Sequence, residues 1–308
     1  MQPKTSPKIE PDAERAKPAT RVSIAAGLAP LVVLVGIAVS LRPFLPAWGF
    51  MWALAAAIFF GLKWLSWWRA RGDVVHAAWR SWAYLFAWPG MDAAAFLGDA
   101  RPAQPSVMRW IWASAKAAAG IVLLFLCART VPDSLPLLRG WVGLLGLILV
   151  LHFGSFELIA LAWQSLGVNA EPIMQTPVLS RSLSEFWGKR WNLGFRQLSY
   201  DFVFQPLHRG LGVAGATLLV FLFSGLIHES VISLPARGGY GLPTGYFLLQ
   251  GLGVALERSS AGKILGLRGG FSGWAFMAIM TAGPAFCLFH PPFVTRVVLP
   301  FMRAIRAL

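Results

Sequence analysis

The chain has few charged residues, and acidic residues are the scarcest of them. Only 13% of its 308 residues are Asp, Glu, Lys or Arg, whereas a typical soluble domain carries about 25%. Hydrophobic residues make up 56% of the chain and the mean hydropathy is +0.61. This composition excludes an ordinary soluble domain and predicts an all-α polytopic membrane protein, because a helix satisfies its own backbone hydrogen bonds in lipid.

Cysteine is also scarce, and its placement excludes two kinds of site. Cys127 and Cys287 lie far apart, each within an apolar run. They form neither a disulfide framework nor the spacing of a metal site. The chain shows no glycine-rich nucleotide loop and no internal repeat. We therefore expect one domain, no metal, and no pair of corresponding broken helices of the kind found in many transporters.

The basic excess is large, with 27 Lys and Arg against 13 Asp and Glu and a net charge of +14. In a soluble protein this balance would suggest nucleic acid. In a membrane protein, basic residues flank the spans and meet anionic headgroups, and the 15 tryptophans suit the membrane interface. The expected partner of this surface is the lipid bilayer and not nucleic acid.

Long apolar runs alternate with polar connections from residue 22 onward. We read residues 1–21 as a disordered cytoplasmic tail and 22–308 as a single membrane domain. A spanning helix needs about 20 apolar residues. About eight spans follow, the last of them weak: 22–41, 46–64, 110–128, 141–163, 211–233, 242–257, 270–289 and 292–306.

The distribution of Lys and Arg predicts an orientation. The tail carries five, and the six connections that follow carry one, six, two, five, one and three. Lys63 is counted in the second connection, whereas Arg42 and Arg237 stand alone in the first and fifth. By the positive-inside rule the N-terminus and the even-numbered connections are cytoplasmic. For a bacterial source, the expected location is the inner membrane.

The fourth connection is rich in aromatic and basic residues, and it contains SLSEFWGKRWNL at 182–193. Ser182 followed by Glu185 is a capping box, so a short helix should begin near Ser182. Continued helix would bring Trp187, Arg190, Trp191 and Gly194 to one side. Such a helix could lie on the bilayer surface or line the mouth of a cavity for an anionic, long-chain substrate.

The fifth span contains SGLIHE, Ser224 to Glu229, in an otherwise apolar run. Ionisable residues in spans usually face the bundle interior or a water-filled cavity. A lone histidine there more often makes a packing contact than performs chemistry. The adjacent Glu229, the small residues Ser224 and Gly225, and the preceding aromatic segment favour a functional role for His228.

Taken together, SLSEFWGKRWNL and SGLIHE resemble the wax synthase branch of the membrane-bound O-acyltransferases, with a core at about 150–260. The resemblance implies transfer of a fatty acyl group from acyl-CoA to a hydroxyl acceptor, with a long-chain alcohol as the first expectation. Acyl-CoA would be a co-substrate, no other cofactor is expected, and the reaction would occur in a tunnel between spans. His228 matches the catalytic histidine and Asn192 the family's asparagine.

An imidazole suits this chemistry because it can take the proton of an attacking hydroxyl near neutral pH. Asn192 could hold the thioester carbonyl, the CoA portion or the histidine. We expect Trp187, Arg190, Trp191 and Glu229 to contact substrate or support the site. The alternatives are a proton-coupled transporter relaying protons through His228 and Glu229, acylation of another lipid or envelope acceptor, and a covalent route through Ser224.

Overall fold

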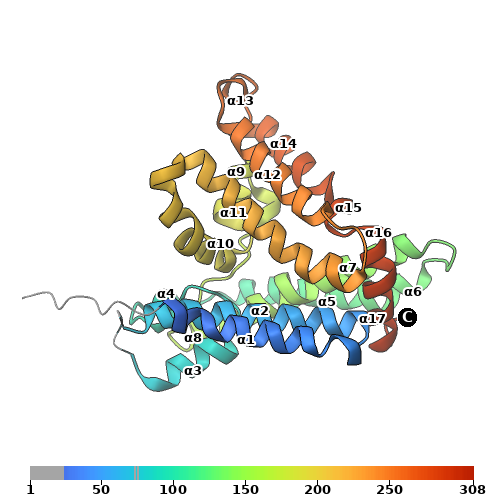
Figure 1. The fold of residues 1–308 in the computed structure, drawn as a ribbon, viewed down its shortest axis with the longest axis horizontal. Helices are drawn as coiled ribbons and strands as arrows, with labels where there is room; N and C mark the ends of the chain where they lie inside the picture. Colours follow the sequence, from blue (N-terminus) through green and yellow to red (C-terminus); the bar gives the residue numbers. More distant parts are fainter. Residues whose placement is uncertain (1–23, 73, 75) are drawn as a thin grey trace, which may run out of the picture.

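The chain folds into helices joined by short turns, as Figure 1 shows. The computed structural model describes residues 24–72, 74 and 76–308, and in these ranges it contains no strand, which confirms the all-α prediction. The tail predicted for residues 1–21 lies outside the described residues.

The α-helices are, in chain order, α1 (Ile24–Ser40), α2 (Ala47–Ala70), α3 (Ala78–Ala87), α4 (Ala93–Leu97), α5 (Val107–Val122), α6 (Ala128–Thr130), α7 (Pro136–Ile148), α8 (Phe156–Ser165), α9 (Leu183–Glu185), α10 (Leu193–Ser199), α11 (Gln205–Ala236), α12 (Leu242–Arg258), α13 (Ser260–Ile264), α14 (Gly270–Ala282), α15 (Ala285–Leu288), α16 (Pro291–Phe293) and α17 (Leu299–Ala304). Two 3₁₀ turns, η1 (Arg42–Phe44) and η4 (Pro177–Leu179), lie between them. Five π-helical segments continue neighbouring helices: η2 (Leu123–Cys127), η3 (Leu149–Ser155), η5 (Phe186–Arg190), η6 (Tyr200–Phe204) and η7 (Val294–Val298).

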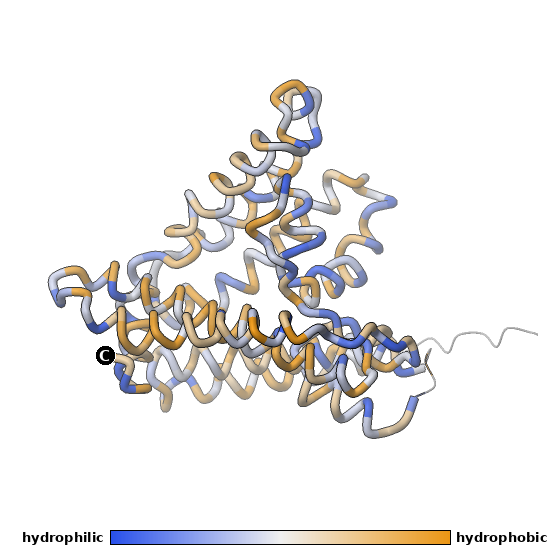
Figure 2. Tube along the Cα trace, turned by 180° about the vertical axis from the view of Figure 1, so that it is seen from behind, coloured by the Kyte–Doolittle hydropathy of each residue, from blue (hydrophilic) through white to orange (hydrophobic). Residues whose placement is uncertain are grey.

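The helices form two layers that meet at one end. In Figure 1, α1 and α2 run along the lower layer beside α5 and α7, while α11, α12 and α14 form the upper layer. The layers meet near α16 and α17, and α12 and α14 rise away from the lower layer toward α13. Helix α2 packs against both α1 and α11, and α12 packs against α11. Figure 2 shows the long helices as largely apolar, with hydrophilic residues gathered mostly at the turns.

Within the residues that the structure describes, all eight predicted spans lie largely on helical segments, but the count of eight is not confirmed. Five helical stretches are long and apolar enough to cross a membrane: Ala47–Ala70, Val107–Thr130, Pro136–Ser165, Leu193–Ala236 and Gly270–Leu288. The first predicted span corresponds to a shorter apolar helix, Ala25–Ser40. Helix α12 has 17 residues, and the last predicted span is divided among α16, η7 and α17. Several apolar helices of spanning length make this a multi-pass membrane protein.

Small residues allow close packing in the lower layer. A Cβ atom added to Gly120 of α5 would lie 2.7 Å from the carbonyl oxygen of Gly146 in α7, and one added to Gly146 would lie 2.8 Å from that of Gly120. The two backbones therefore touch directly. Without a hydrophobic driving force between helices in lipid, such backbone contact is a main source of helix association.

The position of Lys63 corrects the charge count used for orientation. Lys63 is fully buried within α2, where its Nζ donates to the carbonyl oxygen of Gly90 and lies 3.4 Å from the centre of the Tyr84 ring. It is therefore not a connection residue, because α2 continues to Ala70. Arg69 also lies in α2 and Arg109 in α5, so Arg71, Arg80 and Arg101 are the counted basic residues that lie between these two helices.

Candidate active site

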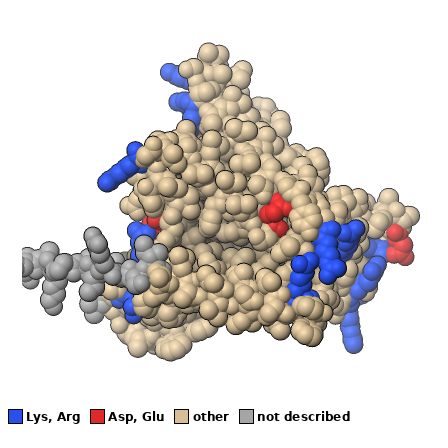
Figure 3. All heavy atoms as spheres, in the orientation of Figure 1, with Lys and Arg blue, Asp and Glu red and all other residues tan. Residues whose placement is uncertain are grey.

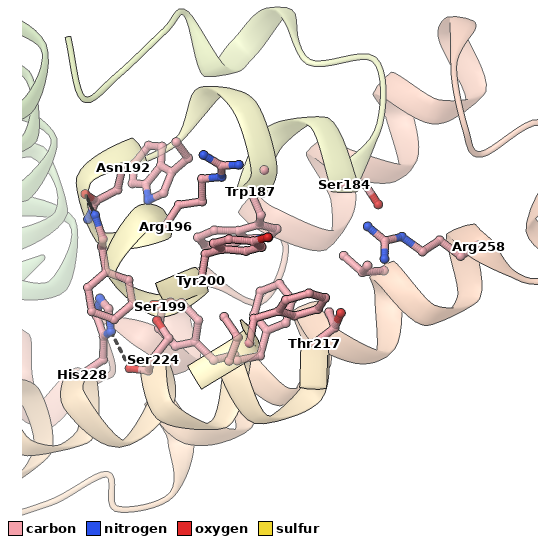
Figure 4. Close-up of a pocket in the computed structure, with 18 residues that line it drawn as sticks. Ser184, Trp187, Asn192, Arg196, Ser199, Tyr200, Thr217, Ser224, His228 and Arg258 are labelled. Atoms are coloured by element: carbon pink, nitrogen blue, oxygen red, sulfur yellow. Dashed lines mark hydrogen bonds between the residues drawn. The ribbon is translucent and has the colours of Figure 1, made fainter. Parts of the chain in front are cut away.

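A cavity of about 290 Å³ lies between the segment 184–204 and helices α11 and α12, as seen in Figure 4. Nine of its 18 lining residues are aromatic or aliphatic and eight are polar or charged, a combination of apolar surface and polar groups that suits a small-molecule site. The lining residues are Ser184, Trp187, Gly188, Trp191, Asn192, Phe195, Arg196, Ser199, Tyr200, Phe204, Thr217, Val220, Phe221, Ser224, His228, Phe247, Val254 and Arg258.

His228 projects from α11 into this cavity with a defined tautomer. Its Nδ1 lies 2.7 Å from the backbone carbonyl oxygen of Ser224, one turn earlier (Figure 4). A carbonyl oxygen only accepts, so Nδ1 carries the proton and, in the neutral ring, Nε2 keeps its lone pair. Phe247 of α12 packs against the imidazole with ring centroids 4.4 Å apart. The ring is thus held with a proton acceptor available to the cavity.

Asn192 lines the same cavity, and its amide also has a defined orientation. Its Oδ1 accepts from the backbone N–H of Phe195 at 3.2 Å and caps the N-terminus of α10. Because the oxygen is engaged with the helix, the Nδ2 amino group is left for the cavity, and no partner for it is found in the described part of the chain. Its φ of 43° lies in the left-handed region, which asparagine tolerates better than most residues.

The helix expected to run from Ser182 through Gly194 is interrupted. Ser182 does begin it, since its Oγ accepts from the N–H of Glu185 at 3.1 Å, but the helix ends at Arg190 and Trp191 is extended. Backbone hydrogen bonds from Gln175 to Arg190 and from Leu193 to Ile173 compete with helical ones. At this break Trp191 and Asn192 both line the cavity.

Trp187 and Trp191, which were predicted to contact substrate, form part of an aromatic wall of the cavity. Their rings lie 6.4 Å apart in an edge-to-face arrangement, and Trp187 also packs against Phe221 and Phe247 at 5.7 Å each. The indole Nε1 of Trp187 donates to Oε1 of the buried Gln250 at 3.3 Å. The wall is therefore anchored to α12.

Arg190, predicted to contact substrate, is outside the cavity lining. Its Nε donates to Oε1 of Glu185 at 2.7 Å, and its Nη1 donates to the carbonyl oxygen of Gln175 at 3.2 Å. The Arg181 amide and the Arg190 guanidinium hold the pKa of Glu185 below its usual value. Arg190 thus links the aromatic segment to Gln175 by hydrogen bonds.

Glu229 is likewise outside the lining and supports it indirectly. Its carboxylate accepts from the backbone N–H of Gly241 at 2.9 Å, and from the N–H and Oγ1 of Thr244 at 3.2 and 2.9 Å. A carboxylate here stabilises the positive end of α12. Since α12 also carries Phe247, Glu229 helps to hold the surface against which His228 packs.

The covalent alternative through Ser224 lacks the required contact. Ser224 lines the cavity, but its carbonyl oxygen, and not its hydroxyl, is the partner of His228 in the described structure. His152 of η3 and Glu157 of α8 are ionisable residues of the predicted span 141–163. Both are absent from the lining, and Glu157 pairs with Lys116.

Several lining residues were missed by the sequence analysis, above all Arg258. Phe247, Val254 and Arg258 are spaced by seven and four residues on α12 and so occupy one helical face. That periodicity was visible in the sequence, but nothing showed which helix this face meets. Arg258 and Arg196 are the basic residues of the lining, which contains no carboxylate.

Comparison with known proteins identifies the segment that builds this cavity. Residues 170–249 match the model of the membrane bound O-acyl transferase family. The chain is 34% identical over 117 residues to a long-chain-alcohol O-fatty-acyltransferase of Simmondsia chinensis, covering 34% of this chain and 33% of that protein.

Two proteins of Arabidopsis thaliana give the same result. The chain is 34% identical over 114 residues to probable long-chain-alcohol O-fatty-acyltransferase 3, covering 32% of the chain and 31% of that protein. It is 36% identical over 107 residues to probable long-chain-alcohol O-fatty-acyltransferase 2, with the same shares. The matched region thus spans about a third of the length of each relative. Residues 170–249, with Asn192 and His228 inside them, thus match the membrane bound O-acyl transferase family, and the resemblance to the wax synthase branch is confirmed.

Proposed function

We propose that this protein is a membrane-embedded O-acyltransferase that moves a fatty acyl group from acyl-CoA to a long-chain alcohol and so forms a wax ester. The observation that carries the proposal is the pairing of two oriented groups in one apolar cavity. His228 offers a free Nε2 and Asn192 a free amide, and both belong to the segment that matches the family. The names of the similar proteins support a long-chain alcohol as acceptor.

In the proposed reaction, Nε2 of His228 takes the proton of the alcohol hydroxyl as its oxygen attacks the thioester carbonyl. A positioned general base of this kind contributes about 10²- to 10⁴-fold to a rate. The carbon–sulfur bond then breaks and the imidazolium returns the proton to the CoA thiolate. The hydrogen bond from Nδ1 to Ser224 keeps the ring in the tautomer that this requires.

Asn192 stabilises the oxyanion that forms when the hydroxyl attacks. Of the three roles left open by the sequence, a bond to the thioester carbonyl agrees best with the geometry, because Oδ1 is occupied and only the donor end is free. Donors aimed at a developing oxyanion are worth more in a water-poor site than in solution. The aromatic wall excludes water here and offers apolar surface to the two chains.

We assign the CoA phosphates to the arginine end of the cavity. Figure 4 shows Arg258 at the end remote from His228. Phe247, which touches His228, lies 11 residues before Arg258, which corresponds to about 16 Å along α12. This separation suits a donor whose thioester and phosphates lie at opposite ends of a flexible arm. Guanidinium groups bind phosphate with charge-assisted hydrogen bonds.

Arg258→Gln should raise the KM for acyl-CoA about tenfold, the effect expected for one charge-assisted hydrogen bond. The KM for the alcohol should stay unchanged. Lys263→Gln is the matched control, because Lys263 is an exposed cation on the neighbouring α13 that lies outside the cavity lining. An acyl-pantetheine donor, which lacks phosphate, should be used equally well by wild type and Arg258→Gln. An equal loss with both donors would refute the phosphate contact.

The function itself is tested by incubating the purified full-length protein with labelled palmitoyl-CoA and a panel of acceptors. Hexadecanol should yield a labelled wax ester faster than a diacylglycerol or a sterol does. A higher rate with another acceptor would support the transferase activity but show that a long-chain alcohol is not the preferred acceptor. Absence of ester with every acceptor, in a sample that is folded, would reject the transferase and favour the transporter alternative.

The proposed topology is compatible with the entry of both substrates. With a cytoplasmic N-terminus, the fourth connection is cytoplasmic, so the donor reaches the cavity from the cytoplasm and the lipophilic alcohol from the bilayer. Cysteine labelling at positions 190 and 237 should report opposite sides of the membrane, which in a bacterial source is the inner membrane.

A further inference from the structure

A second concave site, which shares no lining residue with the cavity of His228, lies where the upper and lower layers meet. It has a volume of about 380 Å³ and lies between η1, the start of α2, the end of α11 and η7. Its lining contains three arginines, Arg42, Arg237 and Arg296, and no carboxylate. Figure 3 shows several basic side chains gathered at this end of the molecule, beside a face that is mostly uncharged.

The guanidinium groups of Arg42 and Arg296 contact neutral groups in the described part of the chain. Nη1 of Arg296 donates to the carbonyl oxygens of Ala236 and Arg237 at 3.1 and 3.0 Å. These are neutral acceptors at the C-terminal end of α11. The guanidinium of Arg42 lies 5.5 Å from the centre of the Phe50 ring, and Phe50 belongs to the same lining. No ion pair with a carboxylate involves any of the three.

This convergence is not explained by the general basic excess of the protein. Arg42 and Arg237 are the only basic residues of the first and fifth connections, which carry the fewest charges. The fold places these two isolated residues around one concavity and adds Arg296 from the C-terminal segment. Both connections belong to the same side of the membrane in the predicted topology, so the site lies at the level of lipid headgroups.

An apolar groove begins next to the arginines. It has a volume of about 900 Å³, lies between α1, α2 and α3, and starts at Leu41, the neighbour of Arg42. On α2, Ala47 and Phe50 line the arginine site, and Ala53, Ala57, Phe60 and Trp64 line the groove on the same helical face. From Phe50 to Trp64 this face extends about 21 Å. The groove is nearly free of polar groups and suits a hydrocarbon chain.

We propose that Arg42, Arg237 and Arg296 bind the phosphate of an anionic phospholipid whose acyl chain lies in the groove between α1 and α2. Three cations without a carboxylate attract a net negative headgroup and repel the choline of a zwitterionic one. Each basic residue near an anionic membrane surface adds to such binding. The site is separate from the acyl-transfer cavity and does not depend on the proposed reaction.

The test measures which lipid stays bound to the full-length protein. Protein in mixed micelles with equal amounts of phosphatidylglycerol and phosphatidylcholine is analysed by native mass spectrometry. Wild type should retain phosphatidylglycerol preferentially. Arg42→Gln should reduce that preference about fivefold, the effect of losing one such charge. Arg42 is the cleanest position, because its guanidinium makes no hydrogen bond in the described structure that the variant would break.

Two further variants control for charge and for folding. Arg42→Lys keeps the charge and should keep most of the preference. Arg303→Gln removes an exposed arginine of α17 outside the site and should leave the preference unchanged. Equal retention of the two lipids by wild type, or an unchanged preference in Arg42→Gln, would overturn the proposal. Displacement of phosphatidylglycerol by millimolar glycerol 3-phosphate would show a site for soluble phosphate and would also overturn it.

Discussion

Replacing His228 with Asn should reduce ester formation by at least a factor of about 10²–10⁴, with little change in thermal stability. The loss follows because the side chain no longer has a basic nitrogen at the position of Nε2, so the alcohol must attack without surrendering its proton. The asparagine amide can still donate to the carbonyl oxygen of Ser224, as Nδ1 does now at 2.7 Å. His228→Ala should lose as much activity and, in addition, the packing against Phe247.

His208→Asn is the matched control for this experiment. Its Nδ1 lies 2.8 Å from the carbonyl oxygen of Gln205, also one turn earlier on α11, but the residue is outside the cavity lining. The control should retain activity within about twofold. Rates are measured with palmitoyl-CoA and hexadecanol and are divided by the folded fraction from size-exclusion chromatography. A folded His228→Asn protein with near-wild-type activity would show that His228 is not the general base.

Replacing Asn192 with Asp should lower kcat by about 10²- to 10³-fold while leaving the fold intact. An aspartate oxygen can still accept from the N–H of Phe195 and cap α10, as Oδ1 does at 3.2 Å. Aspartate also tolerates the left-handed backbone, here with φ of 43°. What it lacks is the amide donor, and its negative charge opposes the oxyanion. The variant therefore separates the chemical role of Asn192 from its structural one.

Asn192→Gly and Asn192→Ala complete the comparison. Glycine accepts the backbone conformation without strain but supplies no donor, so it should be folded and nearly inactive. Alanine loses the cap at a cost of about 1 kcal/mol and adds backbone strain of about 1–2 kcal/mol. It should therefore show the lowest melting temperature of the three. If Asn192→Asp kept activity within a few-fold of wild type, the oxyanion role would be wrong and only the cap would remain.

Much of the fold could be predicted from hydropathy, because whether a segment is apolar and helical depends mainly on the segment itself. Every predicted span coincides with helix in the structure. The π-helical segment η7 within the last one is less visible, because it depends on backbone hydrogen bonding and not on mean hydropathy. Hydropathy also placed Lys63 in a connection and not in a helix. Its burial could not be predicted locally, because its Nζ contacts Gly90 and Tyr84, which are distant in sequence.

The candidate site also has features that the sequence predicted and features that depend on contacts between distant segments. His228 attracted notice because an ionisable residue in an apolar helix is costly, and Asn192 was found through a resemblance that covers its neighbours. The interruption at Trp191 could not be predicted, because the periodicity of 182–194 is helical and the competing hydrogen bonds come from residues 173–175. Arg190 and Glu229 carried charges that suggested substrate contact, whereas each is engaged with protein groups outside the cavity.

The sequence alone determined that this is a helical membrane protein, where its polar and aromatic segment lies, and that a histidine stands inside an apolar run at position 228. Those properties are local, since they follow from the transfer of each segment from water to lipid. Within the described residues, the tertiary structure decided which atoms remain free: Nε2 of His228, Nδ2 of Asn192 and the guanidinium group of Arg258. A free donor or acceptor is defined by what its neighbours already satisfy, and those neighbours are chosen by how the helices pack.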